Sequence, residues 1–191
     1  MVGKEEPSSN RKWVIGVVVL LGLSLVFAGG IALVGRIEDE QGFDTGMQVA
    51  PVKGALAPDF TLVNLEGEKI SLSDFHGQPV LINLWATWCG PCRIEMPAIQ
   101  SRFERYQDDG FVVLAVNFDE QRGDVQAFRD EFGLTFQMLL DPGAEVQKLY
   151  RTRSYPSTFF VDRNGVIQVQ HIGVMTEGNL DGNLAQIGLG N

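Results

Sequence analysis

Apolar and polar residues alternate along the chain in blocks, and the block lengths predict the secondary structure. Two short, nearly continuous apolar runs, 80–86 and 111–116, have the composition of strands that are buried on both faces of a sheet. Residues 98–106, 125–132 and 144–150 carry apolar side chains at helical spacing and predict helices. This alternation of strands and helices predicts an α/β fold with parallel strand pairing.

Two pairs of short strands predict antiparallel hairpins. The first pair, residues 60–63 and 69–72, alternates apolar and polar side chains around a Glu-Gly turn. The second pair, residues 159–161 and 166–169, flanks an Asn-Gly turn, which is typical of tight hairpins. A helix over residues 176–187 closes the chain, with its opening threonine as the N-cap.

The beginning of the chain has a different pattern. Residues 1–12 are polar, and residues 13–35 contain no charged side chain. At roughly 1.5 Å per residue, a helix of this length crosses a hydrocarbon core of about 30 Å, so we expect one transmembrane helix. The alternative is a cleaved signal peptide with small residues near Ala28, although the apolar run continues to Val34, beyond the usual signal core.

After this span, residues 36–56 are charged and then interrupted by glycine and proline, which predicts a linker. We expect the folded domain over residues 57–191. Basic residues in the tail 1–12 precede the span, and an acidic run at 38–40 follows it. By the positive-inside rule, the tail is cytoplasmic and the domain is extracytoplasmic. The net charge of −9 argues against a nucleic-acid partner, because nonspecific binding needs a basic face.

Both cysteines of the chain lie between the first apolar strand and a helix. Cys89 and Cys92 have the spacing C-x-x-C. The first turn of a helix has free backbone N–H groups and the positive end of the helix dipole, which stabilise the reactive thiolate. We interpret the pair as a redox dithiol in which Cys89 attacks a partner and Cys92 resolves the intermediate.

Two other interpretations of the cysteine pair remain open. A zinc site needs four ligands, and the only histidines, His76 and His171, are isolated in the sequence, so we expect no metal. A purely structural disulfide would close a loop too small to constrain the unfolded chain much. No glycine-rich phosphate loop is evident, and we expect no cofactor.

The run LINLWATWCGPCRIEMP resembles the membrane-tethered ResA, TlpA and CcmG type of thiol–disulfide oxidoreductase, in the thioredoxin superfamily with an AhpC/TSA-like domain. The resemblance extends from about Ala57 to the end and includes SYPSTFFVDRNGVI and GVMTEGNL. It implies a thioredoxin-like fold with the first hairpin as an N-terminal extension. It also implies a cis Tyr155–Pro156 bond that faces the cysteines, and a Glu95 side chain that lines the site and tunes them. Asn83 stands where thioredoxins carry a buried, proton-accepting aspartate, so that role passes to another group or to water.

The exchange reaction also needs a docking edge for the partner beside the cysteine pair. The backbone at Tyr155 and Pro156 would pair with a substrate segment as a short strand. Trp88 would form part of the contact rim, and Gly90-Pro91 between the cysteines resembles the reducing members of the superfamily. The implied partners are a disulfide-containing exported protein, such as apocytochrome c, and a transmembrane electron donor of the CcdA/DsbD kind.

The sequence is also compatible with other functions. A thiol peroxidase is suggested by the first hairpin, which resembles peroxiredoxins, but Ala86 occupies the place of their threonine three positions before the attacking cysteine. A general disulfide oxidant or isomerase would use the same dithiol. A tethered binding module whose C-x-x-C is incidental is the non-catalytic alternative.

Overall fold

The computed structural model describes residues 46–190. The expected tail, the expected transmembrane helix and the first part of the expected linker lie outside the described residues. Within 46–190, no helix is long and apolar enough to cross a membrane.

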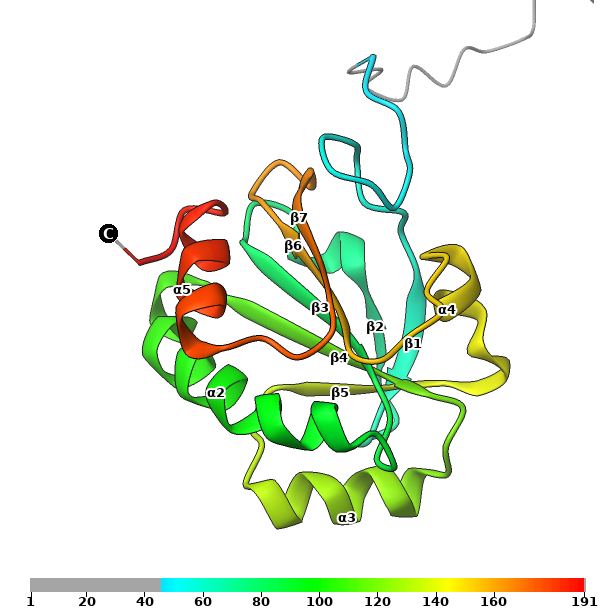
Figure 1. Cartoon of the computed structure of the whole chain (residues 1–191). Helices are drawn as coiled ribbons and strands as arrows, with labels where there is room; N and C mark the ends of the chain where they lie inside the picture. The colour runs from blue at the N-terminus through cyan, green and yellow to red at the C-terminus, as the bar shows by residue number, and fades with distance from the viewer. Residues whose placement is uncertain (1–45, 191) are drawn as a thin grey trace, which may run out of the picture. The chain divides into compact units, whose positions relative to one another are not determined.

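A single seven-stranded sheet organises the described part of the chain (Figure 1). Its strands are β1 (Thr61–Asn64), β2 (Lys69–Ser71), β3 (Val80–Trp85), β4 (Val112–Phe118), β5 (Gln137–Asp141), β6 (Ser157–Val161) and β7 (Ile167–Ile172). Their order across the sheet is β2-β1-β5-β4-β3-β6-β7. The three central strands β5, β4 and β3 are parallel, and both flanks are antiparallel. The carboxyl ends of the central strands therefore meet at one edge of the sheet.

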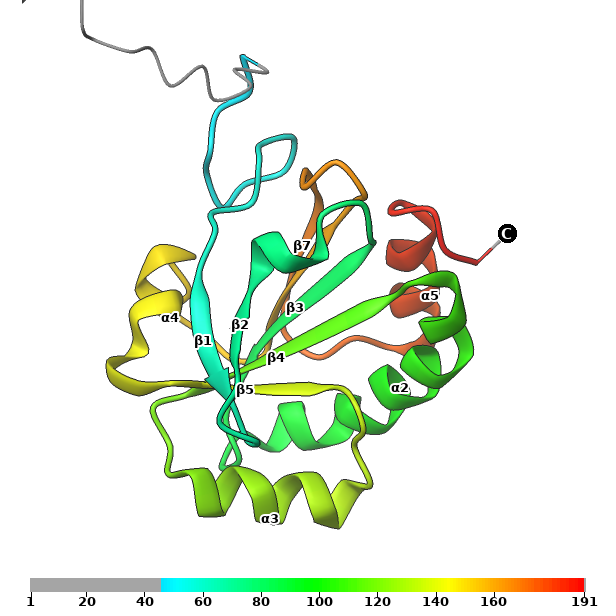
Figure 2. The same cartoon turned by 180° about the vertical axis from the view of Figure 1, so that it is seen from behind.

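Helices cover both faces of the sheet. On one face lie α2 (Gly90–Tyr106), α3 (Arg122–Phe132) and α5 (Glu177–Ala185), whose apolar side chains share a core with alternate residues of the central strands. The opposite face is covered by α4 (Glu145–Leu149) and by the short 3-10 helix Leu72–Phe75, as the view from behind shows (Figure 2).

The alternation along β3 shows how one strand serves both cores. Leu81 and Trp85 belong to the core under α2, whereas Ile82 and Leu84 belong to the core on the opposite face. All four side chains are fully buried, which explains why this strand is a continuous apolar run in the sequence. Asn83 lies on the α2 face by the same alternation, and it is the polar exception in the strand.

The predicted α/β class, the two hairpins and the closing helix are confirmed, the last with Thr176 as its N-cap. The sequence pattern did not predict β5, because its apolar run is short and ends in Asp141-Pro142. Pairing with β4 on one side and β1 on the other makes this segment a strand.

Residues 46–56, which the sequence pattern assigns to the linker, pack on the folded domain. The Gly54 N–H donates to the carbonyl of Ile167 at 2.8 Å, and the Ile167 N–H donates to the carbonyl of Ala55 at 2.9 Å. Leu56 also forms an antiparallel bridge with Val166. The compact unit therefore begins at Gly46.

Candidate active site

The cysteine pair lies where β3 ends and α2 begins. Cys89 is the N-cap residue of α2, with extended backbone angles, and Pro91 lies in the first turn. The backbone N–H of Cys92 donates to the sulfur of Cys89 at 3.2 Å. The Cys89 sulfur thus occupies the place of an N-capping oxygen, where helix N–H groups stabilise negative charge.

Cys89 and Cys92 form a disulfide, with an S–S distance of 2.07 Å. Cys89 is 5% exposed, whereas Cys92 is fully buried, with 0% of its surface exposed. Cys89 is therefore the sulfur that a partner can reach, and Cys92 is enclosed by the core under α2. This difference in access fits attack by Cys89 and resolution by Cys92.

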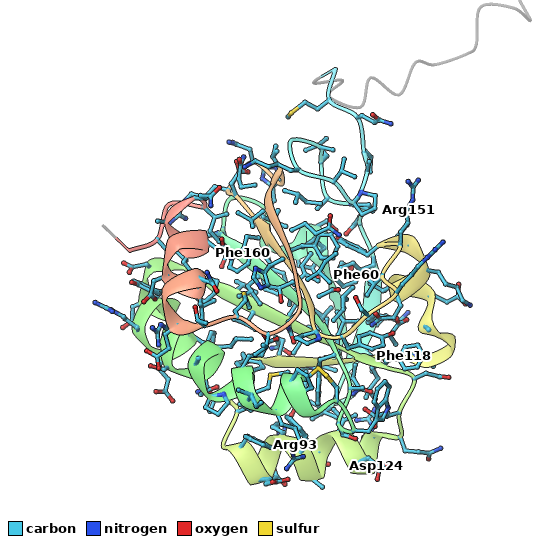
Figure 3. The ribbon with its side chains drawn as sticks, viewed as in Figure 1. Phe60, Arg93, Phe118, Asp124, Arg151 and Phe160 are labelled. Atoms are coloured by element: carbon cyan, nitrogen blue, oxygen red, sulfur yellow. A yellow bond between two sulfur atoms is a disulfide. The ribbon has the colours of Figure 1, made fainter. Side chains whose placement is uncertain are left out.

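Three aromatic side chains form a cluster that includes the residue before Cys89. Trp88 is 64% exposed and meets Tyr155 edge-on, with ring centroids 5.8 Å apart. Phe118, at the end of β4, contacts both of these rings, at 6.4 Å from Trp88 and 5.2 Å from Tyr155. Figure 3 labels Phe118, the last residue of β4. These three rings form one aromatic cluster, of which Trp88 is the exposed member.

The Tyr155–Pro156 bond is cis, as the resemblance implies. Ser157, the first residue of β6, pairs with Leu84 near the end of β3. This register places the cis bond beside the segment that leads to Cys89. Burial, followed by the nearby Asp141 carboxylate, raises the pKa of Tyr155 to about 12, so its phenol is neutral near pH 7.

Glu95 is a buried carboxyl group one turn beyond Cys92 on α2, with only 1% of its surface exposed. Its Oε1 accepts a hydrogen bond from the Asn83 amide at 2.8 Å, and its Oε2 accepts one from the Met175 backbone N–H at 3.1 Å. Burial raises the pKa of Glu95 to about 7, and these two hydrogen bonds lower it by less. The group therefore exchanges protons close to neutral pH.

Asn83 links Glu95 to the strand that follows the cis proline. Its Nδ2 also donates to the hydroxyl of Thr158 at 3.0 Å. Its Oδ1 is buried and finds no hydrogen-bond partner among residues 46–190. The position of the thioredoxin aspartate thus holds an amide that contacts Glu95, so the ionisable group lies on α2 instead of on β3.

The AhpC/TSA family matches residues 54–170 of this chain. The chain belongs to this family. Its relatives include the thioredoxin-like protein YneN of Bacillus subtilis, which is 38% identical over 174 residues, covering 90% of this chain and 95% of YneN. The thiol–disulfide oxidoreductase ResA of Geobacillus kaustophilus is 37% identical over 140 residues, covering 73% of this chain and 80% of ResA.

A solved structure of the thiol:disulfide interchange protein DsbE from Chlorobium tepidum has the same fold. It superposes with a TM-score of 0.67 at 36% identity, covering 72% of this chain and 99% of that chain. This AhpC/TSA-family member is therefore a thiol–disulfide oxidoreductase of the ResA/CcmG type with a thioredoxin-like fold.

The sequence did not indicate two other residues that the fold of this AhpC/TSA-family member brings to the site. Phe118 is the last residue of β4 and Glu120 lies two residues beyond it, and both come near the cysteine segment because β4 is the parallel neighbour of β3. The signal that could have found them is the shared carboxyl edge of the central strands. Within the described ranges, no group of three or more His, Cys, Asp and Glu side chains is arranged to hold a metal ion.

Proposed function

We propose that this oxidoreductase is a membrane-anchored, extracytoplasmic reductant of disulfides in exported proteins, and that apocytochrome c is among its substrates. The observation that carries the proposal is the Cys89–Cys92 disulfide at the start of α2, in a chain similar to ResA. Residues 13–35 would anchor it in the membrane, and a transmembrane donor of the CcdA/DsbD kind would return it to the dithiol form.

The reaction is an exchange of one disulfide for another. In the dithiol form, the Cys89 thiolate attacks one sulfur of the partner disulfide, and the other partner sulfur leaves as a thiolate that takes up a proton. Cys92 then loses its proton and attacks the Cys89 sulfur, which releases the second partner thiol. Two electrons pass to the partner, and the Cys89–Cys92 disulfide remains.

Glu95 is the group that we assign to proton transfer at Cys92. It lies three residues further along α2, on the same helical face, and its pKa of about 7 matches a group that both accepts and donates protons. Asn83 and Met175 hold its two oxygens in place.

The partner segment would bind beside the disulfide. We assign its backbone contacts to Tyr155 and Pro156, in the strand-pairing mode of peptide recognition. Gly90 and Pro91, the two residues between the cysteines, and the exposed Trp88 would form the rest of the contact surface.

A thiol peroxidase is the second candidate, because the matching family is AhpC/TSA. Peroxiredoxins, however, carry a hydroxyl group three residues before the attacking cysteine. Ala86 occupies that position and is fully buried. We expect little turnover of hydrogen peroxide, measured as thiol loss of the reduced full-length protein. A general isomerase would instead restore activity to a scrambled, disulfide-containing protein, and a general oxidant would restore activity to a reduced one.

The proposed location is tested by labelling the cysteines in intact cells. We expect a membrane-impermeant maleimide to label the reduced Cys89 of the full-length protein before the cells are opened. A matched control carries Cys89→Ser, Cys92→Ser and Ser8→Cys, and we expect its label only after permeabilisation. Label on Ser8→Cys in intact cells, with Cys89 protected, would place the catalytic domain in the cytosol and refute the proposal.

Trp88→Ala is expected to weaken partner binding with little effect on the chemical step. An exposed ring of this kind contributes about 0.5–1.5 kcal/mol through aromatic contacts, which corresponds to a rise in KM of roughly twofold to thirteenfold. The measurement is steady-state reduction of a C-x-x-C-H peptide disulfide, with kcat and KM separated. Val49→Ala is the control, because Val49 is also exposed but lies in the segment 46–56 that packs near the start of β7. An unchanged KM for Trp88→Ala would remove Trp88 from the binding surface.

A further inference from the structure

The segment between β3 and α2 is held by a carboxylate from a different part of the chain. The backbone N–H of Thr87, two residues before Cys89, donates to Oε2 of Glu120 at 2.7 Å. The Thr87 hydroxyl donates to Oε1 of the same carboxylate. Asn117, the fully buried residue near the end of β4, donates from Nδ2 to Oε2 at 2.7 Å. One carboxylate thus joins the cysteine segment to the end of the central parallel strand.

The turn that carries Glu120 is itself fixed on several sides. Phe118 packs against Trp88, the residue before Cys89, and against Tyr155, the residue before the cis proline. These contacts tie the turn to both segments. Asp119 adopts a left-handed conformation, with φ of 48°, and its Oδ1 accepts a hydrogen bond from the Gly143 N–H at 2.7 Å. A left-handed non-glycine residue persists only where its surroundings hold it. Glu120 therefore lies in a turn whose two preceding residues are held by contacts with other parts of the fold.

We propose that Glu120 is a positioning residue for disulfide exchange. By binding the Thr87 backbone and hydroxyl, it fixes the path of the segment Ala86–Trp88 and thereby holds the Cys89 sulfur between the start of α2 and the Tyr155–Pro156 edge. The residues that the sequence motif singles out do not include Glu120. The inference rests on the thiol–disulfide exchange activity but needs neither the membrane location nor a particular partner.

The reason for a geometric effect lies in the reaction itself. Thiolate attack needs the nucleophile in line with the partner S–S bond, and a misplacement of roughly 1 Å can cost about a hundredfold in rate. Cys89 follows Thr87 after a single intervening residue, so freedom at Thr87 passes almost directly to its sulfur. Loss of the carboxylate would also leave the Thr87 N–H and the buried Asn117 amide without this acceptor.

Two substitutions of Glu120 separate position from charge. Glu120→Gln removes the charge but can keep the contacts: the amide oxygen accepts from the Thr87 N–H and Asn117, and the amide nitrogen donates to the Thr87 hydroxyl oxygen. Glu120→Ala removes both charge and contacts. Glu131→Ala is the matched control, because Glu131 is an exposed carboxylate whose ion pair is with Arg93 of α2, which Figure 3 labels, and not with the Ala86–Trp88 segment.

The experiment uses the full-length protein, purified in detergent and reduced to the dithiol. The second-order rate of reaction with a peptide disulfide is measured across about pH 5 to 10, and the plateau at high pH gives the rate of the fully ionised Cys89. We expect Glu120→Ala to lower this plateau roughly tenfold, and Glu120→Gln and Glu131→Ala to stay within about twofold of wild type. Thr87→Val, which keeps the backbone contact and loses the hydroxyl contact, is expected to lower the plateau by about threefold.

A purely structural Glu120 would lower the unfolding midpoint of Glu120→Ala and leave its plateau rate unchanged, and that result would overturn the proposal. A fall for Glu120→Gln as large as that for Glu120→Ala would also overturn it, because the contacts would then not be the cause. If Glu120→Ala does not fold, Thr87→Val and Glu120→Gln decide the question by the same plateau. Alkylation by iodoacetamide is a second assay, because it reports the access of the Cys89 sulfur without a partner disulfide. A wild-type protein that fails to reduce the peptide would refute the proposed function. The alkylation rates of wild type and Glu120→Ala would still test whether Glu120 positions Cys89.

Discussion

Cys92→Ser is expected to arrest the protein as a mixed disulfide with its partner, and Cys89→Ser is expected to abolish exchange. Cys89 is the accessible sulfur, so Cys92→Ser still attacks a partner but has no second thiol to release it. Cys89→Ser leaves only the enclosed thiol, and we expect its turnover to fall on the order of a thousandfold or more, as for other enzymes that lose their nucleophile.

The measurement follows from the covalent product. Full-length Cys92→Ser is expressed in cells, free thiols are blocked in acid, and disulfide-linked species are separated without reductant. We expect adducts that disappear on reduction, with exported c-type apocytochromes among the captured proteins. Cys89→Ser and the double variant serve as controls without adducts. Adducts on Cys89→Ser in place of Cys92→Ser would reverse the assigned order of attack, and capture of secreted proteins without apocytochromes would favour a general oxidant or isomerase.

Elements and site residues could be predicted from the sequence where their structure depends on neighbouring residues in the chain. The apolar run before Cys89 predicts β3 because both faces of that strand are buried, and the C-x-x-C spacing then places the sulfurs at a helix start. By contrast, β5 was missed because its strand character depends on neighbours at β1 and β4. A short run is ambiguous until those neighbours are known.

The polar contacts of the site were predictable only in part, because they join residues far apart in the chain. Asn83 and Thr158 are 75 residues apart, and Glu95 and Met175 are 80 apart. The sequence could identify Asn83 as the replacement for an aspartate, but not that its amide would contact Glu95. Nor could it show that Glu120 would reach Thr87, since this depends on the pairing of β3 with β4.

Glu95→Gln is expected to remove a fall in the free energy of unfolding between mildly acidic and neutral pH. The pKa of Glu95 is raised from 4.5 to about 7 in the folded disulfide form, chiefly by burial. Between these values the folded state binds more protons than the unfolded state, so the free energy of unfolding falls as pH rises. A difference of this size corresponds to about 3 kcal/mol, lost across the window from about pH 4.5 to 7.

The test is urea unfolding of the oxidised full-length protein at several pH values across that window. Glu95→Gln carries a neutral side chain of nearly the same shape, so it has no carboxyl group to titrate at this position. Between the two ends of the window, we expect the loss in its free energy of unfolding to be smaller than the loss in wild type by about 3 kcal/mol. Glu131→Gln is the control, since that carboxylate is exposed, and we expect it to keep the wild-type slope. If Glu95→Gln shows the same slope as wild type, the buried carboxyl does not titrate near neutrality, and it loses its assignment as the proton carrier for Cys92. In the expected case, Glu95→Gln loses the pH dependence of the free energy of unfolding. If the rate at which Cys92 resolves the mixed disulfide also loses its dependence on a group that titrates near pH 7, the same Glu95 proton governs both stability and catalysis.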